Sequence, residues 1–144
     1  MDIQVGQLEV IVYIPIKCSK HLWALSVRSV MKCPYYLCLK NEDRSFYDAY
    51  MDLWSKREPD VKRNRPYDHF MRQVADLRRD GGYRSDKAET EPMRIFKGKR
   101  WLLDGHHRAA IICALLGPTT VVPVKEVDDA LPNDLDLCAS PCKD

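Results

Sequence analysis

The segment that decides the fold runs from Trp101 to Ile111 and reads Trp-Leu-Leu-Asp-Gly-His-His-Arg-Ala-Ala-Ile. Three apolar residues lead into an Asp-Gly pair, and a second apolar run then continues as far as Leu116. Gly117 and Pro118 follow, and a glycine with a proline behind it is a usual helix end. The pattern predicts a short strand, a tight turn at 105 and a buried helix over 106–116.

The start of this helix has the chemistry of an anion site. The first N–H groups of a helix lack partners within it, and the helix dipole adds partial positive charge there. Gly105 lets a ligand approach the backbone, and Arg108 offers a planar guanidinium that fits phosphate oxygens. His106 and His107 are candidate general acids or bases, although cations at this end oppose the dipole. The alternative is that both histidines cap the helix and Arg108 pairs with Asp104.

The flanking segments supply the other predicted elements. Apolar patterns predict strands over Leu8–Ile16, Met93–Phe96, Arg100–Leu103 and Val121–Val127. Helical spacing predicts helices over Phe46–Lys56 and Tyr67–Arg79, with a charged connector at Pro59–Pro66 and a polar loop at Tyr83–Glu91. The pattern of Leu22–Met31 is ambiguous, and we expect a helix there. Together they predict an α+β fold, a small mixed sheet with packed helices, in one domain over 1–127 before an acidic tail over 128–144.

The predicted helix over 67–79 has two different faces. Its apolar face carries Phe70, Val74 and Leu77, and Gly81 with Gly82 is expected to end the helix. A polar stripe on another face carries His69, Arg72 and Asp76. Such stripes usually face solvent. This one is expected to help bind a ligand only if the ligand site lies beside it.

Charge is unevenly distributed along the chain. The segment 55–79 has eight basic and four acidic residues, and 93–108 has five basic residues and one acidic residue. A nucleic-acid backbone is a candidate partner for the basic side chains Lys62, Arg63, Arg65, Lys97, Lys99 and Arg100. A solvated helix and an ordinary loop explain the same segments, and a net charge of +2 indicates no nucleic-acid binder by itself.

Composition limits the class of protein. The chain has 144 residues, of which 45% are hydrophobic and 31% are charged, as expected for one globular domain. No apolar stretch approaches the roughly 18 residues of a membrane span, and the start has no secretory pattern, so we expect a cytoplasmic protein. The pairs Cys33/Cys38 and Cys138/Cys142 lack the usual zinc-knuckle spacing, which favours free thiols over a zinc site.

The stretch Asp104-Gly-His-His-Arg-Ala-Ala110, between a predicted strand and a predicted helix, resembles the ParB/sulfiredoxin superfamily, which includes ParB-like nucleases. The motif of that family is Gly, a variable residue, His or Arg, then Arg. The resemblance covers about 67–127 and implies a ParB/sulfiredoxin-like fold. It also implies that Gly105–Arg108 binds the phosphates of ATP or another nucleotide with Mg²⁺, helped by the helix positions of His69, Arg72 and Asp76.

Departures from the family pattern narrow the expected activity. Sulfiredoxins place their nucleophilic cysteine directly after the motif glycine, and His106 stands there, so sulfinic acid reduction is not expected. Partition proteins continue into DNA-binding and dimerisation domains, so a stand-alone domain is expected here. The resemblance to stand-alone members, including the plasmid oncogenic suppression type, implies ATP hydrolysis with DNA cleavage. It also implies inhibition of plasmid or T-DNA transfer, with a protein of the transfer apparatus as partner.

Two further functions stay open. A small-molecule kinase, resembling the free-serine kinase branch, needs a carboxylate base, for which Glu42, Asp43 and Asp76 are candidates. Mg²⁺ has Asp104 and Asp76, or Glu42 and Asp43, as candidate ligands. A non-catalytic module that binds a nucleotide or a partner protein is the third function. Its partner contacts would come from Tyr35, Tyr36, Tyr47 and Trp54, although packing in the core is the more usual role of such residues.

Overall fold

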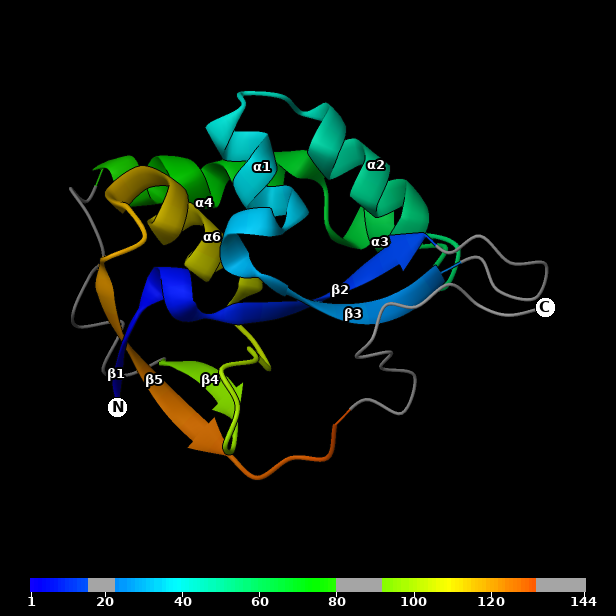
Figure 1. The fold of residues 1–144 in the computed structure, drawn as a ribbon. Coiled ribbons are helices and arrows are strands. Elements are labelled where there is room, and N and C mark those ends of the chain that lie inside the picture. Colours follow the sequence, from blue (N-terminus) through cyan, green and yellow to red (C-terminus); the bar gives the residue numbers. More distant parts are fainter. Residues whose placement is uncertain (16–22, 80–91, 132–144) are drawn as a thin grey trace.

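Helices and strands are interspersed along the chain in a computed structural model that describes residues 1–15, 23–79 and 92–131 (Figure 1). The strands are β1 (Asp2–Gln4), β2 (Glu9–Pro15), β3 (Trp23–Ser29), β4 (Met93–Phe96) and β5 (Val121–Val127). The helices are α1 (Pro34–Lys40), α2 (Ser45–Trp54), α3 (Val61–Asn64), α4 (Tyr67–Arg79) and α6 (His106–Leu116), with short 3-10 helices η1 (Val5–Gln7) and η2 (Val30–Lys32). The class is α+β, as predicted.

The strands form a mixed sheet and a hairpin. Strands β4 and β5 are parallel and are connected through α6, while β1 pairs antiparallel with the other edge of β5. Strands β2 and β3 form an antiparallel hairpin in which Val10 lies opposite Arg28. The parallel pair is possible because helix α6 lies between β4 and β5 in the chain and returns it to the same end of the sheet.

The segment 100–103 connects the sheet to the hairpin. On one side, Glu9 donates its N–H to the Arg100 carbonyl and Leu102 donates to the Glu9 carbonyl, each at 2.8 Å. On the other side, Phe96 donates to the Trp101 carbonyl at 3.0 Å and Leu103 donates to the Arg94 carbonyl at 2.8 Å. The predicted strand Arg100–Leu103 is therefore present only as isolated bridges, to Glu9 and to Ile95.

Six of the eight predicted elements are confirmed, the strand over Arg100–Leu103 is reduced to bridges, and one predicted helix is wrong. The ranges of α4 and β4 match the prediction, and α2, α6, β2 and β5 agree within two residues. The helix predicted over Leu22–Met31 is instead strand β3, because seven residues of it pair with β2. The connector Pro59–Pro66 contains α3, whose Val61 is buried.

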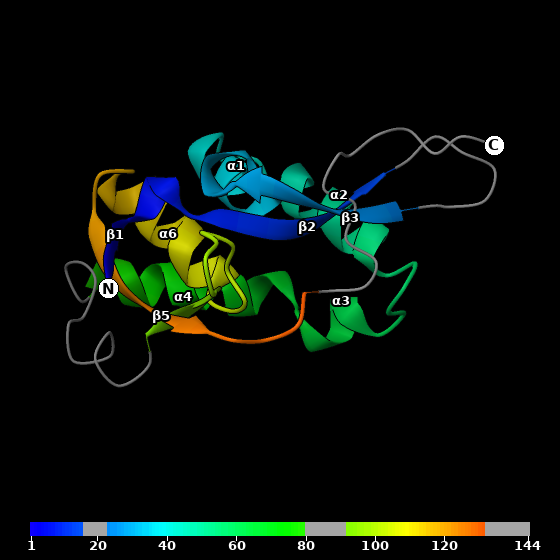
Figure 2. The ribbon, with the colours of Figure 1, turned by 60° about the horizontal axis from the view of Figure 1, so that its bottom comes forward.

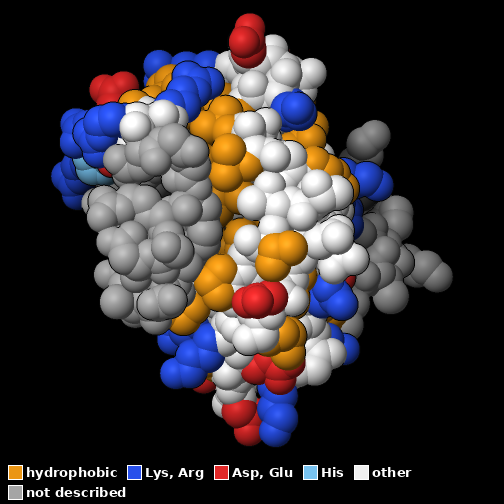
Figure 3. All heavy atoms as spheres, turned by 90° about the vertical axis from the view of Figure 1, so that its left-hand side faces the viewer, with side chains coloured by type: hydrophobic (Ala, Val, Ile, Leu, Met, Phe, Trp, Pro, Cys, Tyr) orange, Lys and Arg blue, Asp and Glu red, His pale blue; other side chains and the backbone are white. Residues whose placement is uncertain are grey.

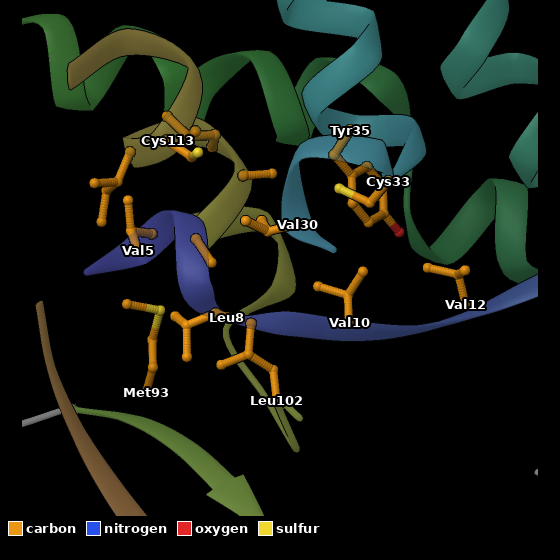
Figure 4. Close-up of a cluster of buried hydrophobic side chains, with 14 of the residues drawn as sticks. Val5, Leu8, Val10, Val12, Val30, Cys33, Tyr35, Met93, Leu102 and Cys113 are labelled. Carbon is orange, nitrogen blue, oxygen red and sulfur yellow. The ribbon is translucent and has the colours of Figure 1, made fainter. Parts of the chain in front are cut away.

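The core lies between the hairpin and the helices. Figures 1 and 2 both place α6 between α4 and the β2–β3 hairpin. Ala109 to Cys113 of α6 are buried, and the small side chains of Ala109 and Ala110 let neighbouring helices approach closely. Figure 4 shows Val10 and Val12 on the side of β2 that faces the helices, with Met93 directed from β4 toward Leu8.

Several expectations concern residues that the structure does not describe. They are the helix end at Gly81 and Gly82, the loop Tyr83–Glu91, the pair Cys138/Cys142 and most of the acidic tail. Within the described tail, residues 128–131 are exposed. Among the described residues, no helix is both long enough and apolar enough to cross a membrane.

Candidate functional site

Gly105 shapes the turn that opens α6. Its φ of +89° lies in the left-handed region that favours glycine. A Cβ at this position would lie only 2.5 Å from Cγ of Met93, so β4 also leaves no room for a side chain. The Ala109 N–H donates to the Gly105 carbonyl at 2.8 Å, so the N–H groups of residues 106–108 precede the helical hydrogen-bond ladder. The turn thus has the helix-start geometry that favours anions.

Asp104 is held by Arg94 of β4. The Arg94 backbone N–H donates to Oδ1 of Asp104 at 3.0 Å, and its Nε donates to Oδ2 at 2.6 Å. This carboxylate raises the pKa of Arg94. The ion pair that the sequence suggested for Asp104 with Arg108 is replaced by this contact, which fixes the turn and occupies both carboxylate oxygens.

His106 is buried against its own turn. Its Nε2 lies 3.1 Å from the Leu102 carbonyl, which can only accept, so Nε2 carries the proton and Nδ1 is the basic nitrogen. Burial lowers the pKa of His106. The imidazole of His106 is therefore neutral near pH 7. It does not place the positive charge at this helix end that the sequence suggested.

His107 packs among aromatic rings. The ring centroids of Tyr35 and Phe70 lie 4.3 Å and 5.2 Å from that of His107, both in edge-to-face arrangements. Nδ1 of His107 lies 3.1 Å from Oε1 of Gln73, while its buried Nε2 has no hydrogen-bond partner in the structure. Burial lowers the pKa of His107 to about 4, helped by the charge of Arg65. His107 is thus also neutral, and it acts in packing.

The polar stripe of α4 lies at the protein surface. His69, Arg72 and Asp76 are exposed, and the Asp76 carboxylate lies 3.2 Å from Arg79. Phe70 and Gln73 are the α4 residues that contact His107. Gln73 was missed from the sequence, although its position three residues after Phe70 places both on one face. Arg94 was also missed, because no spacing rule relates it to Asp104.

The two predicted nucleic-acid segments lie apart and are partly neutralised. Figure 1 places the turn after β4 below the β2–β3 hairpin, whereas α3 lies above it. Lys62 pairs with Asp52, and Arg63 lies 3.3 Å from Asp60. Arg100 donates to Gln7 at 2.8 Å, and Lys99 lies 4.9 Å from the Trp101 ring centroid. Arg65, a third basic residue of the segment around α3, lies with its guanidinium over the Trp54 ring.

The left-hand side of the molecule in Figure 1 has a surface with exposed hydrophobic side chains. Figure 3 shows a band of hydrophobic side chains down this side, with Lys and Arg side chains gathered toward the top and bottom. Leu116 at the end of α6 and Val121 at the start of β5 are 42% and 56% exposed.

The residues do not form a metal centre in the described part of the chain. No group of three or more His, Cys, Asp or Glu side chains there is arranged to hold an ion. Cys33 and Cys38 are free and buried, and burial raises the pKa of the Cys33 thiol to about 12. Asp43 accepts the Ser45 N–H at 2.9 Å and so serves the start of α2.

No protein-family model, curated protein or solved structure matches this chain. An assignment of function therefore depends on the residues of the turn and their surroundings.

Proposed function

We propose that the start of α6 binds the phosphates of a nucleotide, ATP or another, and that the protein hydrolyses it. The observation that carries the proposal is the left-handed Gly105, pressed against Met93 ahead of a helix with Arg108 in its first turn. The N–H groups of residues 106–108 and the Arg108 guanidinium are the phosphate ligands in this proposal. Both would stabilise charge that develops on phosphate oxygens.

The two histidines have different roles in the proposal. His106 holds its Nε2 proton on the Leu102 carbonyl, so its neutral Nδ1 is suited to accept a proton from an attacking water. His107 contacts Gln73 and the ring of Tyr35, so it positions the first turn of α6. Base catalysis is therefore assigned to His106 and support of the turn to His107.

Mg²⁺ has no set of protein ligands in the described residues. The Asp104 carboxylate is used by Arg94, and that of Asp76 by Arg79 on the exposed side of α4. Mg²⁺ commonly binds through substrate phosphates and water with few protein ligands. We therefore place any Mg²⁺ on the phosphates of the nucleotide and derive no step through a protein-held ion.

We add DNA cleavage and inhibition of plasmid or T-DNA transfer to the proposal. Only the resemblance to the ParB/sulfiredoxin superfamily supports these two activities. The kinase alternative has weaker support, because two of its candidate bases have other partners: Asp43 accepts the Ser45 N–H, and Asp76 pairs with Arg79. The binding-module alternative also has weaker support. Tyr35 and Tyr47 are buried in the core rather than presented to a partner.

Phosphate release from ATP with Mg²⁺ tests the proposal. We expect Arg108→Ala to lower turnover about 100-fold, as for loss of one oxyanion donor, and Arg108→Lys to restore part of it. Arg78→Ala, at an exposed position near the end of α4, is the matched control and should stay within about twofold. Supercoiled plasmid in a parallel reaction reports DNA cleavage. Absence of both phosphate release and a nucleotide-dependent rise in Tm for the wild type would overturn the proposal.

A further inference from the structure

Strand β3 is the outer strand of the β2–β3 hairpin. All of its residues, Trp23–Ser29, lie opposite residues of β2, and no other strand of the described residues pairs with it. Figures 1 and 2 both show β3 beside β2, with no other described strand along it. An unpaired strand edge presents a row of backbone donors and acceptors that a further strand can bind. Strand β3 has 7 residues, whereas β1, at the edge of the other sheet, has 3.

The hydrogen-bond pattern of the hairpin determines which residues of β3 face this open edge. The Val30 N–H donates to the Leu8 carbonyl at 3.0 Å, in line with the register of the hairpin. Residue pairs in an antiparallel ladder alternate between those that exchange hydrogen bonds and those that do not. Arg28 therefore bonds to β2, whereas Leu25 and Val27 direct their N–H and C=O groups outward. The Val27 carbonyl fits this pattern, because it accepts from Nη1 of Arg28 at 3.1 Å.

The open edge of β3 is complementary to a second copy of itself. An antiparallel pairing centred on Ser26 places Leu25 of one copy opposite Val27 of the other. These are the two residues that direct their backbone groups outward, so each such pair can exchange hydrogen bonds in both directions. The Val27 carbonyl can accept a second bond beside that from Arg28, because a carbonyl oxygen has two lone pairs.

The side chains of β3 also suit a second copy. Arg28 is the only charged residue of β3, and the pairing centred on Ser26 places it opposite Ala24 of the other copy. The two guanidinium groups therefore do not face each other across the strands, where like charges would repel. Val27 lies opposite Ile11 of β2, and both are partly exposed. Leu25 of the second copy would extend this apolar row.

We propose that β3 pairs antiparallel with β3 of a second copy of this chain, centred on Ser26, and that the protein forms a dimer. The two hairpins then form one sheet in the order β2–β3–β3–β2. Each copy uses its β3 edge once, so the contact closes in a dimer and does not continue into a filament. A contact through one strand edge is small, and we expect a dissociation constant of about 10–100 µM. The dimer is independent of the proposed nucleotide hydrolysis.

Sedimentation velocity of the full chain tests the dimer between about 5 and 500 µM, a range that spans the expected dissociation constant. We expect the wild type to change from monomer to dimer over this range. Val27→Pro removes an N–H that faces the open edge rather than β2, so the hairpin is retained and dimerisation weakens by about 10-fold or more. The matched control Val27→Thr keeps both the N–H and a β-branched side chain and should stay within about threefold. Circular dichroism reports whether each variant is folded.

Disulfide trapping tests the register. In the proposed pairing the two Ser26 residues form a pair without hydrogen bonds, whose Cα atoms lie about 4.5 Å apart and within reach of a disulfide. The two Ser29 residues lie about 20 Å apart in the same pairing. We therefore expect oxidised Ser26→Cys to form a linked dimer, and Ser29→Cys to form no more than the wild type, which controls for the native cysteines.

Amide hydrogen exchange tests the edge without any substitution. We expect the amides of Leu25 and Val27 to exchange more slowly at about 500 µM than at about 5 µM, because only the dimer covers them. Equal protection at both concentrations would overturn the proposal, since the edge would then be covered within its own chain. A wild type that stays monomeric would also overturn it, as would unchanged dimerisation in folded Val27→Pro or equal trapping at positions 26 and 29.

Discussion

At the scale of single residues, Gly105 carries two constraints that a substitution tests together. Gly105→Ala introduces left-handed strain and a contact with Met93, and we expect it to lower the free energy of unfolding by about 2–4 kcal/mol. Gly98→Ala is the matched control, since its φ is +74° but no atom lies within 4 Å of a Cβ there. Strain alone should cost about 1 kcal/mol. Urea unfolding of both variants checks this, and equal costs would contradict the Gly105–Met93 contact.

The buried imidazole of His107 predicts an acid-sensitive fold. Its pKa of about 4 lies below the ordinary value of 6.5, so the unfolded chain takes up a proton at a higher pH than the folded one. Stability should therefore fall as pH falls from about 6.5 to about 4, by about 3 kcal/mol from this group. His106 acts in the same direction, because its pKa is also lowered.

His107→Gln should make the free energy of unfolding less steep in this pH window, measured by urea unfolding at several pH values. His69→Gln removes an exposed imidazole from α4 and controls for the loss of a histidine. An unchanged slope in His107→Gln would show that His107 is not buried in the folded protein. The comparison uses slopes, so a loss of packing in the variant does not hide the result.

The turn at Gly105 was predictable from sequence, but the state of its histidines was not. A glycine between a strand pattern and an apolar helix pattern indicates a tight turn by local rules. The neutrality of His107 depends on Tyr35 and Phe70, which reach it from α1 and α4. Local spacing contains no information about such distant neighbours.

At the scale of elements, the segment 100–103 couples the sheet to the hairpin. The amides of Glu9, Phe96, Leu102 and Leu103 all donate across this segment at 3.0 Å or less. We expect these four amides to exchange with solvent at similar slow rates. Leu102→Ala, at a fully buried position, should cost about 3 kcal/mol and accelerate their exchange together. Hydrogen exchange by NMR checks this, and unrelated rates would contradict the coupling.

The error over Leu22–Met31 also belongs to this scale. Val27 and Leu25 recur with a spacing that suits a strand, yet the short apolar run suited a helix equally well. Pairing with β2 decided the outcome, because seven residues of β3 lie opposite β2. Helix α4 was predictable because a 13-residue amphipathic pattern has no competing strand period.

At the scale of the whole molecule, the fold sets which acidic or aromatic partner each basic residue contacts. Sequence counts treated Lys62, Arg63 and Arg65 alike, but Asp52 and Asp60 neutralise the first two and Trp54 orients the third. Asp104 was likewise expected near Arg108 or a metal, and Arg94 binds it. Ion pairs between distant segments are set by the fold. Composition therefore predicts the amount of charge, but it does not predict which charged residues are paired.

The central claim is that the N–H groups at the start of α6 bind nucleotide phosphates. The most direct measurement follows the backbone amide resonances of the labelled protein during titration with ATP and Mg²⁺. We predict that His106, His107 and Arg108 shift first and furthest, and that Arg108→Ala weakens the apparent Kd at least 10-fold. Shifts confined to other segments, or none at millimolar ATP, would contradict the claim.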